Sequence, residues 1–350
     1  MKSKFIVLAL FFLILAGAQS RTAAKGQDTV TVAFWNVENF FDTLDDKAKN
    51  DEEFLPGAKK QWTGERYLTK IEHLGQAIKE MNAKHGPDII GMAEIENKAV
   101  VEDLVKRQLS KMKYQIVHVQ SPDERGISTA MLFRTSIFKL VKAAGDTVHL
   151  ADNHATRLIL HATLQGKGKE IVHVFVNHWP SRLGGEEKSE GNRIAAAKEL
   201  RKNVDAVLAA DPAASIVIMG DFNDEPDNNS IKTELKAEQF ICDSANFSFS
   251  LHNLAWQKKR NGEGTLKYRN QWNMLDQIIV SSSVLQTTKS SFRYVCGSFD
   301  IFKADFMIEH GEKYEGSPLP TYGGNKYLGG YSDHFPVYAK FLLEKTKAKK

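Results

Sequence analysis

Residues 157–178, with the sequence RLILHATLQGKGKEIVHVFVNH, contain two strand-like runs and no helical pattern between them. Arg157–Leu164 alternates as a half-buried strand does, whereas Ile171–Val176 has the apolar character of a buried strand. The turn residues of Gln165–Gly168 predict a hairpin between the two runs. Because one strand follows another directly, the pattern argues against a strictly alternating α/β fold and favours sheets packed face to face.

The rest of the chain has more strand patterns than helix patterns. Apolar and β-branched runs predict further strands at Thr29–Trp35, Asp88–Ala93, Ser128–Phe133, Ser215–Met219, Met274–Val280 and Phe335–Leu343. Apolar residues at three- and four-residue spacing predict helices over Leu68–Met81, Val101–Met112 and Ile194–Val207. We therefore expect an α+β fold in which helices cover the outside of a sandwich of sheets.

Composition indicates a globular protein and leaves its partner open. The 350 residues are 42% hydrophobic and 26% charged, which excludes collagen-like and wholly disordered classes. A net charge of +4, from 47 basic and 43 acidic residues, neither demands nor excludes a nucleic-acid partner. Residues 28–343 contain no fixed-period repeat and no Pro- or Ser-rich linker, so we predict one monomeric domain, followed by a basic tail at 344–350.

The first twenty residues have the pattern of a secretory signal peptide. Lys2 and Lys4 precede the apolar run Phe5–Leu15, and small residues follow it. The run is shorter than the roughly 20 residues that cross a bilayer, so we expect an exported periplasmic or extracellular protein without stable membrane insertion. Cys242 and Cys296 would then lie in an oxidising compartment. The sequence is compatible both with a disulfide between them and with two buried free thiols.

Polar side chains recur where the apolar strands begin or end. Asn36, Glu94 and His178 follow three of the strands, Asp221 and Asn223 follow a fourth, Asp276 interrupts a fifth, and Asp333 and His334 open the last. Buried charges are costly unless they are paired or bind a metal. We therefore expect these groups to converge at one edge of the sheets.

The residue types predict a divalent-metal site that acts on phosphate esters. Hard oxygen ligands suit Mg²⁺, Mn²⁺ or Ca²⁺ better than zinc, and they are offered by Asn36, Glu94, Asp221, Asn223 and Asp333. Such ions stabilise the charge that develops in phosphoryl transfer. A histidine can take a proton from water when a carboxylate orients it, and His334 has Asp276 and Asp333 as candidate partners. A second histidine, such as His178, could stabilise or protonate the departing oxygen.

Six short motifs resemble those of the endonuclease/exonuclease/phosphatase superfamily and stand in the family's order. They are FWNVEN (34–39), GMAE (91–94), NHWPS (177–181), GDFNDEP (220–226), LDQI (275–278) and SDHFPV (332–337). The family includes pancreatic-type deoxyribonucleases, abasic-site endonucleases, bacterial sphingomyelinases and inositol polyphosphate 5-phosphatases. The resemblance covers about Val30 to Phe341 and implies a four-layer α/β/β/α sandwich with two central mixed, mostly antiparallel sheets.

The resemblance also implies a role for each residue of the motifs. The implied roles are metal ligation by Asn36, Glu94 and Asp333, general-base catalysis by His334 with Asp276 as its orienting partner, leaving-group stabilisation or protonation by His178, and contact with phosphate, water or metal by Asp221 and Asn223. We expect the ion to be Mg²⁺, with Mn²⁺ or Ca²⁺ as alternatives.

Three arginines are candidates for contact with a substrate phosphate. Arg125 lies in Asp123–Ile127, which is similar to an Asp-x-Arg-Gly segment of exported relatives; phosphate contact and a turn with a salt-bridged arginine both remain open. Arg182 is a second candidate, whereas Arg193 better fits a surface position near a helix N-terminus. The segment Gly311–Gly330 predicts a long loop over the site, where specificity often resides.

The function expected from these features is that of an exported divalent-metal phosphodiesterase, specifically an endonuclease that hydrolyses DNA or RNA. A phosphatase or a sphingomyelinase-like phospholipase of the same superfamily is the first alternative. A non-catalytic binding module on the same fold is the second. The sequence contains no long apolar hairpin for insertion into a membrane and no strongly basic patch for gripping duplex DNA.

Overall fold

The computed structural model describes residues 27–242, 247, 250–286, 290–311 and 314–344. The predicted signal peptide at 1–20 and the tail beyond Glu344 lie outside these described residues. None of the helices within the described ranges combines the length and the apolar character needed to cross a membrane.

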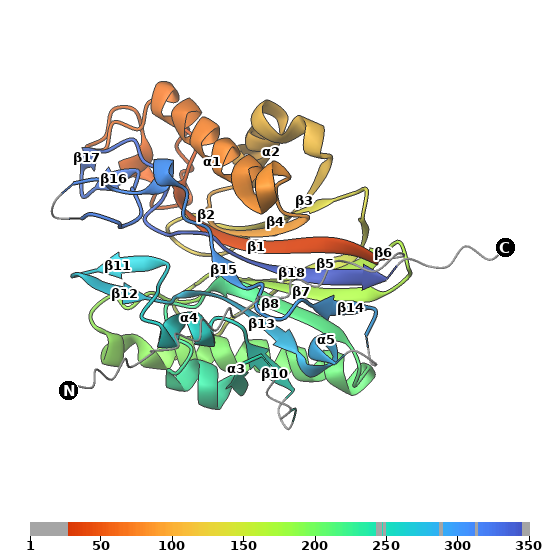
Figure 1. Cartoon of the computed structure of the whole chain (residues 1–350). Helices are drawn as coiled ribbons and strands as arrows, with labels where there is room; N and C mark the ends of the chain where they lie inside the picture. Colours follow the sequence, from red (N-terminus) through yellow and green to blue (C-terminus); the bar gives the residue numbers. More distant parts are fainter. Residues whose placement is uncertain (1–26, 243–246, 248–249, 287–289, 312–313, 345–350) are drawn as a thin grey trace, which may run out of the picture.

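Two seven-stranded sheets face each other at the centre of the molecule (Figure 1). The first sheet has the order β14-β18-β1-β2-β4-β3, with β15 paired to β18. Its strands are β1 (Gln27–Phe40), β2 (Ile89–Ile95), β3 (Tyr114–His118), β4 (Ser128–Arg134), β14 (Phe292–Tyr294), β15 (Asp300–Ile301) and β18 (Val337–Glu344).

The second sheet has the order β5-β6-β7-β8-β13-β10-β9. Its strands are β5 (Phe138–Asp146), β6 (Ile159–Gly166), β7 (Ile171–His178), β8 (Ser215–Asp221), β9 (Ala237–Gln239), β10 (Leu251–Asn253) and β13 (Asp276–Ser281). In the two sheets, β1–β2, β7–β8 and β9–β10 pair in parallel, and the other paired strands are antiparallel. The prediction of two mixed, mostly antiparallel sheets is confirmed.

Helices cover the outer faces of the sandwich (Figure 1). The helices α1 (Gly64–Lys84) and α2 (Lys98–Leu104) lie over the first sheet, and α3 (Glu186–Ala210) lies over the second. Each long helix buries the apolar stripe that its sequence predicts, including Ile71 and Leu74 of α1 and Leu200 and Val204 of α3. The predicted four layers are therefore confirmed. Two short helices, α4 (Trp256–Arg260) and α5 (Ser282–Leu285), lie between strands.

Gly91 lies where the two sheets approach each other closely. A Cβ atom on this β2 residue would lie 2.7 Å from Sδ of Met219 and 3.0 Å from Cγ1 of Val176, both in the opposite sheet. A larger residue would force the sheets apart, because packed interiors leave no room for an extra methyl group. The small residue at this position thus sets the spacing between the two halves of the site.

The local structure differs from the sequence expectations at several elements. The helix predicted over Val101–Met112 is α2 continued by a π turn and a 3₁₀ turn. The strand expected from Arg157 begins at Ile159, and the strand expected from Met274 begins at Asp276. No pattern predicted β3 or β5; β5 is an edge strand in which exposed lysines break the apolar alternation.

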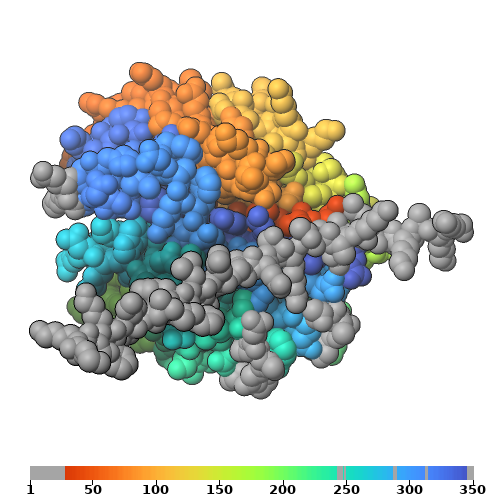
Figure 2. All heavy atoms as spheres, viewed as in Figure 1, coloured from red at the N-terminus to blue at the C-terminus, as the bar shows by residue number. Residues whose placement is uncertain are grey.

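The segment Gly311–Gly330, predicted as a long loop, contains a small hairpin of β16 (Tyr322–Gly323) and β17 (Lys326–Tyr327) in its described part. A similar hairpin pairs β11 (Leu266–Tyr268) with β12 (Gln271–Asn273). Tyr322 packs in an aromatic cluster with Phe41, Phe54 and Trp62, which follow β1. In Figure 2 the blue surface of the residues before β18 accordingly lies against the orange surface of the residues after β1.

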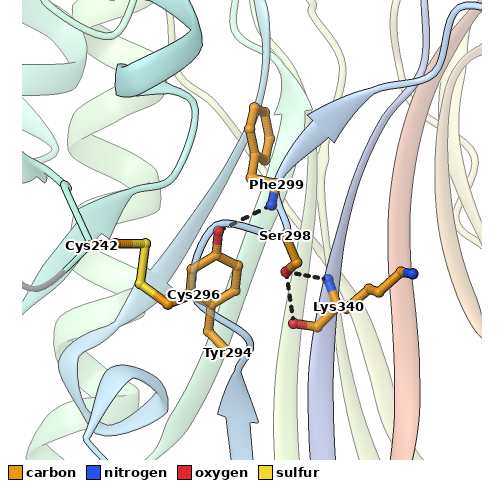
Figure 3. The surroundings of a disulfide bond; sticks show 6 residues. All are labelled: Cys242, Tyr294, Cys296, Ser298, Phe299 and Lys340. Atoms are coloured by element: carbon orange, nitrogen blue, oxygen red, sulfur yellow. Dashed lines mark hydrogen bonds between the residues drawn. A yellow bond between two sulfur atoms is a disulfide. The ribbon is translucent and has the colours of Figure 1, made fainter. Parts of the chain in front are cut away.

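A disulfide joins Cys242, which follows β9 of the second sheet, to Cys296, which follows β14 of the first (Figure 3). Beside it, the Tyr294 hydroxyl accepts a hydrogen bond from the Phe299 backbone N–H at 3.0 Å, and Ser298 exchanges two hydrogen bonds with the Lys340 backbone. Of the two alternatives that the sequence left open, the structure shows the disulfide.

The disulfide should contribute measurably to stability. The double variant Cys242→Ser/Cys296→Ser should lose about 2–4 kcal/mol of unfolding free energy, because the cross-link spans a sequence separation of 54 and restricts the unfolded chain. Urea denaturation with and without reductant measures this. Reductant should destabilise the wild type by a similar amount and leave the double variant unchanged, whereas equal wild-type midpoints would contradict the expectation.

Three strand histidines, His118, His161 and His173, lie half-buried in the sheets. The His161 ring stacks on Phe175 with 4.0 Å between centroids, and its Nε2 lies 3.1 Å from Nδ1 of His173. Burial lowers the pKa of His118 and of His161 to about 4. Both side chains are therefore neutral in the folded protein at pH 7.

These low pKa values predict acid sensitivity. An unfolded chain protonates its histidines near pH 6.5, whereas the folded chain resists until about pH 4. Stability should therefore fall as the pH is lowered from 6.5 toward 4, and His161→Phe should reduce that loss. Thermal melts in chelator between pH 7 and pH 4.5 test this. His149→Gln, at an exposed position, is the control that should keep the wild-type slope; an unchanged slope in His161→Phe would refute the expectation.

Candidate active site

The strand directions bring the predicted site residues to one edge of both sheets. β1 and β2 run parallel, as do β7 and β8, so Asn36, Glu94, His178 and Asp221 lie near carboxyl ends that face the same way. β13 and β18 run antiparallel to their neighbours β8 and β1, so their first residues reach this edge too. In register, Asp221 stands opposite both His178 and Asp276. The convergence predicted from the strand ends is therefore present.

His334 and Asp276 form a buried pair that joins the two sheets. His334 Nδ1 lies 2.7 Å from Asp276 Oδ2, which leaves Nε2 facing Asp221 Oδ2 at 3.9 Å. Ser332 Oγ accepts from the His334 backbone N–H and donates to the Asn36 carbonyl. Burial lowers the pKa of His334, but the carboxylates of Asp276, Asp333 and Asp221 outweigh it and hold that pKa well above its usual range. With these groups alone the imidazole is therefore protonated at neutral pH, with Nδ1 engaged by Asp276 and Nε2 directed at Asp221.

Asp221 lies at the centre of the site. Its Oδ2 accepts a hydrogen bond from Asn36 Nδ2 at 3.0 Å and lies 3.8 Å from His178 Nε2. Burial, opposed by the nearby His334, raises the pKa of Asp221 to about 6. Asp221 thus connects both histidines with the amide of the first sheet.

Glu94 reaches the site from an irregular end of β2. Its φ of +61° is left-handed, and the β2–β4 register shifts between Ala93 and Ile95. Glu94 Oε2 accepts from the Asn39 backbone N–H at 2.8 Å, while Oε1 lies 3.5 Å from Asn36 Nδ2 and 3.9 Å from His178 Nε2. Backbone strain of this kind persists where surrounding contacts hold a side chain in a needed position.

His178 is held from behind by Arg157, which the sequence reasoning did not identify. The Arg157 guanidinium donates to the carbonyls of His178 and Trp179 and pairs with Asp123 at 3.1 Å. Burial, together with Arg157, Arg125 and His334, lowers the pKa of His178 well below its usual range. At pH 7 His178 is therefore a neutral side chain that can donate one hydrogen bond.

Asn223 and Arg182 lie side by side at the far edge of the site. Asn223 has a left-handed φ of +51°, its backbone N–H donates to Asp221 Oδ1 at 2.9 Å, and its Nδ2 donates to the Trp179 carbonyl. Arg182 Nε donates to the Asn223 carbonyl at 2.7 Å, and its other nitrogens contact Asp224, Asn228 and Glu186. Arg182 is thus held by neighbouring groups of the chain and supports Asn223.

Arg193 corrects the expectation of a surface position. It is fully buried beneath the N-terminal part of α3, and its Nε lies 2.7 Å from Asp224 Oδ1. The helical pattern alone gave no sign of this, because the partner carboxylate comes from the loop after β8.

Arg125 and Asp333 are the accessible members of the predicted set. The Asp123–Gly126 segment is a turn, yet Asp123 pairs with Arg157, and Arg125 Nη2 instead donates to Asn39 Oδ1 at 2.8 Å. Arg125 is exposed beside the strand end that carries Asn36, so it can meet a ligand there. Asp333 is half-exposed, with Oδ1 4.0 Å from His334 Nε2.

A buried network links the site to the segment before β18. Lys70 Nζ donates to Thr321 Oγ1 at 2.6 Å and to the Tyr331 carbonyl at 2.8 Å, while Glu38 accepts from the backbone of Thr321 and Tyr322. Burial lowers the pKa of Lys70 to about 8 and raises that of Glu38 to about 7. Sequence reasoning missed both residues.

The site has the chemistry that a divalent cation requires. Its carboxylates offer hard oxygens, and ligand atoms of Asp221, Asp276 and His334 lie within 4.8 Å of one another in a group that could hold a metal ion. Among the described residues, Asp276 Oδ1 and His178 Nδ1 are buried without a hydrogen-bond partner. Such orphaned atoms beside several carboxylates fit a site completed by a bound ion, water or phosphate.

Comparisons with known proteins agree with this arrangement. The sequence model described as the endonuclease/exonuclease/phosphatase family matches residues 31–345. No curated protein matches the chain.

Three solved structures of similar fold illustrate the range of the family. Truncated TDP2 from Caenorhabditis elegans is 17% identical, with a TM-score of 0.52 and coverage of 89% of this chain and 97% of that one. TDP2 from D. rerio, complexed with single-strand DNA product, is 14% identical, with a TM-score of 0.52 and coverage of 89% and 98%. The mannosyl-6-phosphatase of Bacteroides thetaiotaomicron is 16% identical, with a TM-score of 0.53 and coverage of 89% and 99%. At these identities the likeness shows the fold.

Arg157 should be important for stability because it compensates a buried carboxylate. Arg157→Met leaves Asp123 and two backbone carbonyls unpaired, so it should cost about 3–5 kcal/mol of unfolding free energy. Arg125→Met, two residues from Asp123 but exposed, is the matched control and should change stability by less than about 0.5 kcal/mol. Chemical denaturation measures both; equal losses in the two variants would contradict the assignment.

Proposed function

Because the chain belongs to the endonuclease/exonuclease/phosphatase family, we propose that it is an exported, divalent-metal-dependent phosphodiesterase, specifically an endonuclease that hydrolyses DNA or RNA. The observation that carries the proposal is the His334–Asp276 pair, whose free Nε2 faces Asp221 and, across it, the neutral His178. A binding module would not need this combination of a histidine polarised by a carboxylate, another histidine that is neutral, and several further carboxylates around one small space.

His334 is the general base of the proposed reaction. Its Nδ1 is engaged by Asp276, which fixes the orientation of the ring, so Nε2 is the atom that takes a proton from the attacking water. Asp276 supports the imidazolium that then forms, as a carboxylate does in other histidine pairs. On the other side of Nε2, the Asn223 backbone N–H donates a hydrogen bond to Asp221 and holds its carboxylate in place.

His178 stabilises the departing oxygen by donating a hydrogen bond. Its low pKa makes it neutral at pH 7, so hydrogen-bond donation fits the structure better than transfer of a proton from an imidazolium. Arg157 fixes the backbone that carries His178. Asn223 adds a polar side chain on the same side of the site.

Asn36, Glu94 and Asp333 are the proposed ligands of the cation, for which Mg²⁺ is the first choice and Mn²⁺ or Ca²⁺ the alternatives. When bound, the ion supplies positive charge that neutralises the carboxylates and a phosphate oxygen. In this proposal Asp276 stays with His334 rather than binding the ion, because its Oδ2 is already engaged at 2.7 Å.

The substrate proposal depends on local groups rather than on overall charge. Arg125 is exposed next to the first-sheet half of the site and can contact the phosphate of a polymer lying across it. Arg182 acts as a positioning residue for Asn223 and could contact phosphate only by exchanging its present partners. The disulfide and the signal-peptide pattern at 1–20 support export.

A phosphomonoesterase is the competing proposal, because a solved structure of similar fold is a mannosyl-6-phosphatase. A sphingomyelinase-like activity has less support, since the sequence contains no long apolar hairpin for insertion into a membrane.

The proposed function is tested by comparing cleavage of plasmid DNA, RNA, a chromogenic phosphodiester, sugar phosphates and sphingomyelin in Mg²⁺, Mn²⁺, Ca²⁺ or chelator. Cleavage of nucleic acid inside the strand is expected, and chelator should abolish it. His334→Ala and Asp276→Asn should each lower kcat by about 10²–10⁴-fold with a smaller change in KM, because proton transfer in the transition state is lost.

The matched control for this experiment is His310→Gln, an exposed histidine outside the motifs that pairs with Asp305, which should keep the wild-type rate. Full activity in chelator, or wild-type kcat in His334→Ala, would overturn the mechanism. Turnover of sugar phosphates alone would replace the nuclease by a phosphatase, and no turnover of any substrate would favour a binding module.

A further inference from the structure

A second group of acidic side chains surrounds a separate cavity of about 220 Å³ between the loop after β1 and the end of β2. Five carboxylates line it: Asp42, Asp45, Asp46, Asp51 and Glu96. None of them belongs to the catalytic set described above. Carboxylates gathered this closely repel one another, which costs free energy unless a positive charge compensates them.

Asp51 is the observation that points to a ligand. Its side chain is only 2% exposed, and Oδ2 accepts a hydrogen bond from the Asp46 backbone N–H at 3.0 Å. Oδ1 is buried and has no partner among the described residues. Burial raises the pKa of Asp51, and the nearby Asp45 and Asp46 carboxylates raise it further. A buried carboxylate oxygen without a donor, on a residue that lines an acidic cavity, is a candidate ligand atom.

The chain itself does little to neutralise the cavity. Lys49 also lines it, but its Nζ donates to the carbonyls of Ser121 and Asp123. Lys47 pairs with Asp45 at the exposed rim. The remaining carboxylates accept hydrogen bonds from neutral groups, as when Asp42 accepts from the Leu44 backbone and from Asn97.

We propose that this acidic cavity is a second divalent-cation site, that its ligand is Ca²⁺, and that Asp51 Oδ1 is one of its coordinating atoms. Ca²⁺ takes about six to eight oxygen ligands in flexible geometry, which carboxylates on an irregular loop and the amide oxygen of Gln120 can supply. Mg²⁺ demands a near-ideal octahedron and gives up its water reluctantly, so several carboxylates on an irregular loop suit it less well.

The position of the cavity gives the ion a structural task. The loop that carries Asp51 contacts the turn that carries Arg125: Lys49 donates to the Ser121 and Asp123 carbonyls, and the Asn50 backbone N–H donates to the Glu124 carbonyl at 2.7 Å. Glu96 accepts from the Asp42 backbone N–H at 2.5 Å and so connects this loop to the end of β2. An ion here would fix the loop, the strand end and the Arg125 turn relative to one another.

The test measures Ca²⁺ binding by the full chain, by titration calorimetry and by thermal melting after chelation. Saturating Ca²⁺ should raise the wild-type Tm by about 3–5 °C. Asp51→Asn removes a ligand charge, so it should weaken this binding at least about tenfold and abolish the shift. Asp46→Asn, at an exposed position, should weaken binding in the same direction and serves if Asp51→Asn folds poorly.

Two control variants distinguish Ca²⁺ binding in this cavity from Ca²⁺ binding at the catalytic site or to exposed acids in general. Glu52→Gln, an exposed acid next to Asp51 but outside the cavity lining, should bind Ca²⁺ like the wild type. Glu94→Gln, in the catalytic site, should keep the Ca²⁺-dependent shift even if activity is lost. Wild-type Ca²⁺ binding by both Asp51→Asn and Asp46→Asn, loss of the shift in Glu94→Gln, or equal affinity for Mg²⁺ at this site would overturn the proposal.

Discussion

The hydrogen bonds that cross between the two sheets are the constraint on which the site depends. His334, in the turn just before β18, binds Asp276 at the start of β13, and Asn36 of β1 binds Asp221 of β8. Each bond joins one sheet to the other in a buried place, where an unpaired charge would be costly. The two sheets must therefore keep a fixed position relative to each other, to within a fraction of the length of a hydrogen bond. Gly91 permits the close approach that this requires.

The electrostatics of the site favour the binding of a cation. The carboxylates around His334 hold its pKa well above the usual range, and burial raises that of Asp221 to about 6. Both shifts reflect an excess of negative charge in a place with little water. A positive ion among these carboxylates would relieve the excess and lower the pKa of His334, which would leave Nε2 unprotonated and able to accept a proton at neutral pH. The same imbalance would favour a phosphate only when the ion is present, so ion and substrate are expected to support each other's binding.

The sequence predicted the sandwich and most of the inner site, because both follow from local patterns. Asn36, Glu94, His178 and Asp221 end apolar runs, and parallel neighbours place such ends together. Buried cations were the main failure: Arg157, Arg193 and Lys70 look like surface residues in a local window. Their partners Asp123, Asp224 and Thr321 lie 34, 31 and 251 positions away along the chain. Partnership at that distance is a tertiary property, which no local pattern encodes.

The same buried cations connect the rigid site to the variable parts of the molecule. Lys70 and Glu38 bind the backbone around Thr321, so the segment before β18 is fastened to the helix and strand that support Asn36. Arg157 fastens the turn of Arg125 to the backbone of His178 through Asp123. Loops attached in this way can change sequence at their tips without moving the groups at the strand ends, because the attachment points are buried and hydrogen-bonded. Differences in substrate among proteins of this fold are then expected at the tips, while the chemistry stays with the strand ends.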